Sequence, residues 1–190
     1  MTDSSLTSVE ASTPKGVPYD RQAMAVSEWS ADIYAALKDW AGNFTSRWEW
    51  WQPGYLVLTI TGDENGAVEP VQIDTCEDEL TVFVGMWETH LPTYEMPADN
   101  ELALAVAEAK RLTEDWRVSH LLTVVFFDGN EKWCGSLTSS PEELSERLQY
   151  GVEWISNFGP KRAEVRSARR DQWRFFSVTP DHRLEEQISG

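Results

Sequence analysis

The fold of this chain is constrained most by two apolar runs. They are ELTVFVGMW at 79–87 and HLLTVVFF at 120–127. Each run is strand-like and has large apolar side chains on both faces. In the first run, Val82 and Val84 point to one face and Phe83 points to the other. A strand that is apolar on both faces has to be covered on both sides. The sequence therefore predicts strands that are buried in a core together with other elements.

Three further stretches have the 3.6-residue period of amphipathic helices. They cover residues 26–44, residues 98–116, and a third segment that runs from Ser140 to Gly159. The third helix begins with SPEE, in which Ser is the N-cap residue, Pro the first helical residue and Glu the third. This order is typical of a capping box. We expect these helices to cover the apolar strands.

The remaining apolar stretches form hairpin patterns separated by turn residues. They pair 55–61 with 68–74, 120–127 with 131–137, and 162–168 with 172–178. Pro70 cannot donate a ladder hydrogen bond, so its strand is expected at a sheet edge or on a bulge. The prediction is a single α+β domain at 21–180, with a mostly antiparallel sheet and about three helices. Polar flexible tails are expected at 1–20 and 181–190.

Charge is distributed unevenly along the chain. The formal net charge is −16, and the window 48–109 contains 13 acidic residues but no Lys or Arg. Residues 161–174 reverse the sign with six basic side chains. The acidic window is either a solvated face or a docking surface for a basic protein partner, and an acidic chain repels nucleic acid and anionic membranes.

Ten Trp residues are present, and three of them lie close together at Trp48, Trp50 and Trp51. In a strand, Trp48 and Trp50 face one side and Trp51 the other, so at least one ring lies on the less buried side. Clustered Trp beside carboxylates is typical of a protein-binding hot spot, although the rings could equally pack under the first helix. The candidate partner-binding residues are Trp48, Trp50, Trp51, Asp63, Glu64, Glu77, Asp78, Glu79, Trp87 and Glu88.

Glu88 and His90 form the other candidate site. Residues i and i+2 of a strand share a face, so both side chains could act together in acid–base or metal chemistry. A metal site needs three or four ligands, and no HExxH or CxxC spacing accompanies this pair. Local hydrogen bonding of His90, or its exposure where the strand leaves the core, explains the pattern better. We therefore expect no cofactor and no metal.

The absence of other sequence motifs argues against further classes of chemistry. The chain has no Walker A loop, no GxGxxG after a strand and no GxSxG. The N-terminus lacks the charged and apolar regions of a signal peptide, which predicts a cytoplasmic protein with Cys76 and Cys134 as reduced thiols. No apolar run approaches the roughly 18 residues of a membrane span.

In overall character the chain resembles bacterial cytoplasmic immunity proteins, which are small, acidic, single-domain and free of catalytic motifs. This resemblance implies a non-enzymatic inhibitor of a basic toxin or effector domain. The alternatives are a small metal-dependent or acid–base hydrolase that uses Glu88 and His90, and a DNA-mimic protein. We expect a monomer or a weak homodimer.

Overall fold

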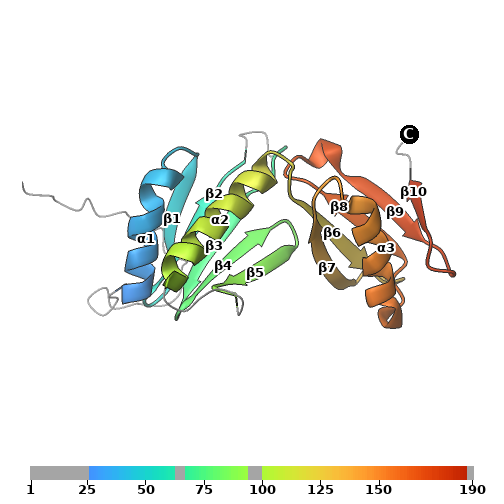
Figure 1. The fold of residues 1–190 in the computed structure, drawn as a ribbon, viewed down its shortest axis with the longest axis horizontal. Helices are drawn as coiled ribbons and strands as arrows, with labels where there is room; N and C mark the ends of the chain where they lie inside the picture. The colour runs from blue at the N-terminus through green and yellow to red at the C-terminus, as the bar shows by residue number, and fades with distance from the viewer. Residues whose placement is uncertain (1–25, 63–66, 94–99, 188–190) are drawn as a thin grey trace, which may run out of the picture.

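The computed structural model describes residues 26–62, 67–93 and 100–187. The α+β class, the antiparallel pairing and the three α-helices are confirmed in these residues, and the strands form two five-stranded sheets rather than one (Figure 1). The elements are α1 (Glu28–Ala41), β1 (Ser46–Gln52), β2 (Tyr55–Ile60), β3 (Val71–Cys76), β4 (Glu79–Val84), β5 (Trp87–Leu91), α2 (Glu101–Arg117), β6 (Leu122–Phe127), β7 (Trp133–Ser139), α3 (Leu144–Trp154), β8 (Arg162–Arg166), β9 (Arg174–Val178) and β10 (Leu184–Gln187). Two short 3-10 helices are η2 (Ser156–Phe158) and η3 (Arg170–Gln172).

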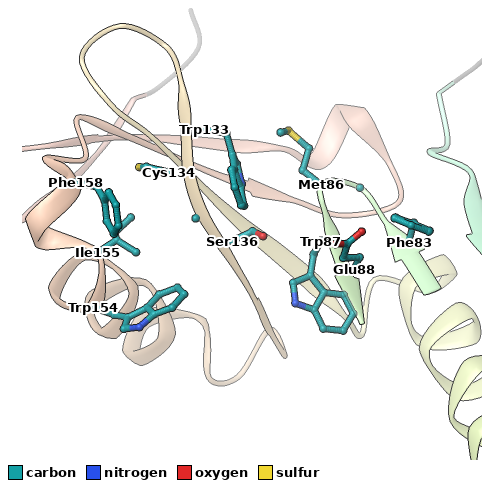
Figure 2. Close-up of a pocket in the computed structure, with 12 residues that line it drawn as sticks. Phe83, Met86, Trp87, Glu88, Trp133, Cys134, Ser136, Trp154, Ile155 and Phe158 are labelled. Atoms are coloured by element: carbon teal, nitrogen blue, oxygen red, sulfur yellow. The ribbon is translucent and has the colours of Figure 1, made fainter. Parts of the chain in front are cut away.

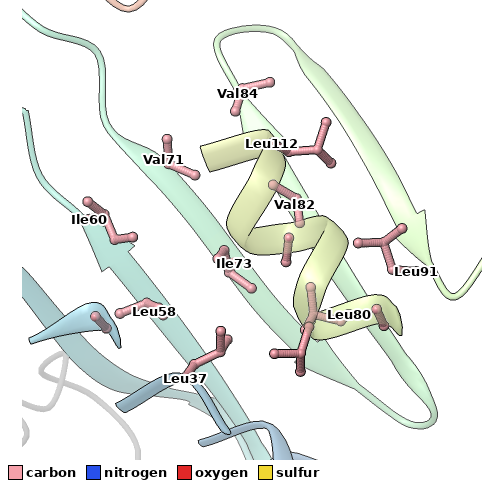
Figure 3. Packing of buried hydrophobic residues seen from close by; sticks show 14 of the residues in the cluster. Leu37, Leu58, Ile60, Val71, Ile73, Leu80, Val82, Val84, Leu91 and Leu112 are labelled. Atoms are coloured by element: carbon pink, nitrogen blue, oxygen red, sulfur yellow. The ribbon is translucent and has the colours of Figure 1, made fainter. Parts of the chain in front are cut away.

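The first sheet is a meander in which β1 to β5 follow one another in sequence order. Helices α1 and α2 cover one face of it, because alternate strand residues supply an apolar surface that matches the apolar stripe of each helix (Figures 1 and 3). Leu58, Ile73 and Val82 stand side by side on neighbouring strands and are fully buried beneath the helices. The opposite, outer face is more polar: it carries Asp74, Thr81 and His90 together with the apolar Val57 and Phe83.

The second sheet has the order β10-β9-β8-β6-β7, and α3 packs on one face. Helix α3 begins at Leu144, later than the sequence predicts: the Ser140 hydroxyl accepts a hydrogen bond from the Glu143 N–H at 3.3 Å in the preceding turn, and the N-cap residue of the helix is Glu143. Its buried face packs against Val124 and Phe126 of β6. None of the described helices is both long and apolar enough to cross a membrane.

The two sheets meet at one junction. The β4–β5 turn lies against the second half of the chain, where Gly85 approaches Trp116 and Thr123. Beside it, the Glu69 N–H donates to the Ala168 carbonyl at 2.6 Å, and Ala168 is buried in the core of the first sheet. The two cores are therefore connected through backbone contacts as well as side chains.

Three predictions about the strands need correction. The run 79–87 is a hairpin, because Gly85 and Met86 form a two-residue turn between β4 and β5. Pro70 does not put its strand at an edge: β3 begins directly after it and lies in the middle of the sheet. The segment expected as a C-terminal tail contains β10, which pairs with β9. The expected N-terminal tail at 1–20 lies outside the described residues.

Candidate functional site

The Trp cluster predicted from the sequence lies on β1, an edge strand of the first sheet. Trp48 is half-buried on the helix-covered face and makes an edge-to-face contact with Tyr34, with ring centroids 5.0 Å apart. A register irregularity separates Trp50 from Gln52, and both Trp50 and Trp51 are exposed. The cluster therefore combines a packed ring with two exposed ones.

Trp87 and Glu88 lie on β5, at the opposite edge of the same sheet. Four strand spacings of about 4.8 Å separate the two edges, which places β1 and β5 roughly 19 Å apart. The predicted aromatic anchors are therefore found in two places rather than in one patch.

The predicted acidic residues also occupy different places. Glu77 and Asp78 form the exposed β3–β4 turn, at the end of the sheet away from Gly85, and Glu79 begins β4. The backbone carbonyl of Glu79 accepts a hydrogen bond from the Trp29 indole at 2.9 Å. Asp63 and Glu64 lie outside the described residues.

Glu88 and His90 share the outer face of β5, as their spacing predicts. The His90 Nδ1 lies 3.1 Å from the Glu79 carboxylate and 3.2 Å from the Thr81 hydroxyl. Glu88 faces Phe83 across the strand pair. In the described part of the chain, no three His, Cys, Asp or Glu side chains are close enough to hold a metal ion.

One buried carboxylate accompanies these residues on the outer face. Asp74 of β3 is buried beside Gln72, whose amide donates to both carboxylate oxygens at 2.9 and 3.0 Å. Burial raises the pKa of Asp74, the Gln72 hydrogen bond opposes this rise, and the negative charge of Glu88 adds to it. Asp74 and Glu88 therefore repel each other electrostatically across the sheet.

A groove of about 720 Å³ lies between the β4–β5 hairpin and the second half of the chain (Figure 2). Its size is within the range of small-molecule and peptide-anchor pockets. We call it the aromatic groove; it is lined by Phe83, Gly85, Met86, Trp87, Glu88, Trp133, Cys134, Gly135, Ser136, Trp154, Ile155 and Phe158. Strand β7 and the end of α3 supply the residues that face the hairpin.

The aromatic groove has unusually exposed apolar walls. Trp133, Trp154 and Phe158 are 55%, 56% and 66% exposed, and Met86 at the hairpin turn is exposed as well. Large apolar side chains that gather on a surface mark interaction sites more often than isolated ones do. A smaller hollow of about 240 Å³ shares Trp87, Ser136 and Trp154 with the groove, and its lining is more polar, with Thr138 and Arg147 among its residues.

Cys134 is the cysteine of the groove, and its environment makes its thiol less acidic than a free thiol. Burial raises the pKa of the Cys134 thiol, so the thiol is protonated at neutral pH. Cys76 ends β3 at the opposite end of the sheet, next to the acidic turn, and its pKa is also raised. Both cysteines are free, as expected.

The five arginines of the basic segment 161–174 form ion pairs within the molecule. Its arginines pair with carboxylates from several elements: Arg162 with Glu131 and Glu164, Arg166 with Glu164, Arg169 with Asp171, Arg170 with Glu69, and Arg174 with Glu186. The Arg170–Glu69 pair joins this segment to the acidic window across the junction. The basic segment and the acidic window noted in the sequence are therefore joined by an ion pair within one molecule.

Sequence reasoning missed Trp133, Trp154 and Phe158 as site residues. A signal for Trp154 was available in α3, where the apolar stripe through Leu148 and Val152 leaves Tyr150 and Trp154 on another face. Apolar residues outside the stripe of a helix indicate a second contact surface.

Comparison with protein-family models, with curated proteins and with solved structures finds no match to this chain.

Proposed function

We propose that this protein is a non-enzymatic binding module for a basic protein partner, and that the aromatic groove anchors the partner. The observation that carries the proposal is the exposure of Trp133, Trp154 and Phe158 around one hollow. Trp side chains are the most common energetic anchors of protein interfaces, since a partner that covers them removes a large apolar area from water.

Charge supports a basic partner. Glu88 lines the groove, and Arg47 is the single Lys or Arg in the five strands of the first sheet. Carboxylates around an apolar anchor attract a cationic partner over long distances and repel anionic ones. An inhibitor of a basic toxin or effector domain, such as an immunity protein, is the specific form of this function that we propose.

The two alternatives are less well supported. A hydrolase would need Glu88 and His90 beside a substrate cavity, and the His90 ring is engaged with Glu79 and Thr81 instead. A DNA mimic would present carboxylates without apolar anchors, whereas five of the twelve residues that line the groove are aromatic and one is a carboxylate. We therefore favour the protein-binding function.

The test uses single Trp variants in partner capture and binding kinetics. Immobilised protein captures its partner from the host lysate, and association and dissociation are then measured for Trp133→Ala and Trp154→Ala. We expect faster dissociation, with a loss of about 2 kcal/mol or more for an anchoring Trp. Neutralising Glu77, Asp78 and Glu79 together should slow association and weaken its dependence on salt.

Trp51→Ala is the matched control, because Trp51 is 55% exposed, as Trp133 is, and lies on β1 away from the groove. We expect this variant to bind like the wild type. If Trp51→Ala loses the partner while both groove variants retain it, the binding site is the β1 edge and the groove assignment is wrong. A captured toxin should also lose its activity in the complex.

A further inference from the structure

Strand β5 has a free edge that continues out of the aromatic groove. It is the last strand of the first sheet, and among the described residues no strand pairs with its outer edge. Strand β7 comes near the start of β5, where Trp87 and Ser136 share the groove. Beyond this point the edge continues along β5 past Glu88 and His90.

The hairpin register determines which backbone groups point outward. Gly85 and Met86 form a two-residue turn, so Val84 and Trp87 are the hydrogen-bonded pair that closes it. Bonded and non-bonded pairs alternate along antiparallel strands. The N–H and C=O groups of Glu88 and His90 therefore point away from β4, toward the free edge.

This five-residue edge strand carries the charged Glu88 but lacks three other features that commonly block strand addition. Proteins protect free edges with Lys, Pro or bulges. The edge strands β1 and β7 each take part in a register irregularity, whereas β5, like the edge strand β10 of the second sheet, pairs with its neighbour in continuous register. The sequence of β5, WETHL, has neither Lys nor Pro.

The charges beside this edge select the chemistry of an added strand. On the outer face, Glu88 and the Glu79–His90 pair lie along β5 at alternate positions. On the inner face, Trp87 and Thr89 are half-buried. A strand added here would place alternate side chains against carboxylates and against apolar surface.

We propose that the β5 edge binds an extended segment of the basic partner as an added strand, with basic and apolar residues alternating and one apolar end in the aromatic groove. This inference rests on the proposed function and specifies how the partner is recognised. Main-chain hydrogen bonds provide affinity in such complexes, and pockets for alternate side chains provide specificity. A second copy of this chain is the less suitable occupant, since two molecules with a net charge of −16 repel each other.

The test uses a synthetic peptide of eight alternating Lys and Val residues with Phe at each end. The control peptide has the same composition with its Lys and Val residues in two blocks. Amide hydrogen exchange should show slower exchange at Glu88 and His90 with the alternating peptide. Alkylation of Cys134 should slow as well, while Cys76, at the far end of the sheet, should react at an unchanged rate.

A pair of variants separates main-chain from side-chain recognition. His90→Pro removes the outward N–H, and an edge strand tolerates Pro at such a position. His90→Ala removes the side chain and keeps this N–H. We expect His90→Pro to bind the alternating peptide about tenfold more weakly than His90→Ala does. If His90→Pro does not fold, N-methylation of alternate peptide residues makes the same test on the unchanged protein, and only one of the two methylation patterns should abolish binding.

Three outcomes would overturn strand addition: equal binding by the two His90 variants, equal effects of both methylation patterns, or protection of other strands instead of β5. A dimer with Glu88 and His90 protected in the absence of peptide would assign the edge to a second copy and would also overturn it. If the Trp154→Ala variant loses the protein partner while His90→Pro retains it, the groove function stands and the strand mode alone fails.

Discussion

Gly151 is the residue at which helix preference and packing oppose each other. It lies within α3, and a Cβ at this position would overlap the ring of Phe126 and crowd Leu137. Gly→Ala in a helix interior ordinarily stabilises by about 1 kcal/mol, whereas overpacking a core costs about 1–3 kcal/mol. We expect Gly151→Ala to lower the free energy of unfolding in denaturant titrations. Ser145→Ala, at an exposed position of the same helix, should leave it unchanged or raise it slightly.

Asp74 gives the protein a pH dependence of predictable sign. Its pKa is raised in the folded state, first by burial and further by Glu88, so the ionised form is disfavoured on folding. Its contribution to stability is complete below the unfolded pKa of about 3.9 and is lost as the pH rises through the folded pKa.

The Asp74→Asn variant, which can still accept a hydrogen bond from Gln72, should therefore be more stable than the wild type at pH 7. The difference should close toward about pH 3, where Asp74 is protonated in both states. Thermal unfolding of the wild type and of Asp74→Asn across this pH range measures the stability difference. The Asp78→Asn variant, in the exposed turn, controls for the change in net charge. A stability difference that is independent of pH would contradict this account of Asp74.

The β4–β5 hairpin depends on its turn. Gly85 has a φ of 58°, and a Cβ there would lie 3.1 Å from the Thr123 hydroxyl and 3.3 Å from the Trp116 ring. Left-handed backbone costs a residue with a Cβ about 1–2 kcal/mol. We expect Gly85→Ala to lower the free energy of unfolding by about this amount or more, because the neighbours are close.

Gly129→Ala is the matched control for Gly85→Ala, because Gly129 lies in another hairpin turn. A Cβ at Gly129 would meet only the flexible Lys161 side chain at ordinary contact distance. Its effect should stay within about 0.5 kcal/mol. Equal effects of the two substitutions would contradict the role of the β4–β5 turn in joining the sheets.

The elements were predictable from the sequence where local pattern determines them. Ile33 and Leu37 indicated α1 by their helical spacing, and the residues around Asp128 indicated the β6–β7 hairpin. The split at Gly85 was missed because the apolar alternation continues through the turn. The aromatic groove could not be predicted, since it forms where β5 and β7 approach each other, and no local pattern relates two strands separated by the 41 residues 92–132.

At the scale of the whole molecule, the junction should make unfolding cooperative. Ala168 from the second half is fully buried in the core of the first sheet, and Arg170 pairs with Glu69 beside it. We expect one calorimetric transition, with equal calorimetric and van't Hoff enthalpies. Ala168→Glu, which places an unpaired charge in this core, should separate the transitions or lower both. Two transitions in the wild type would mean that the sheets unfold independently.

The meander order of the first sheet has a consequence for synthesis of the chain. Every strand of this sheet pairs with its neighbour in sequence, so its contacts close over short loops and form quickly. The sheet and its two helices are complete once Arg117 has left the ribosome, whereas Ala168 arrives much later. During this interval the β5 edge is exposed to neighbouring nascent chains, and the acidic residues that we assign to recognition also keep such chains apart.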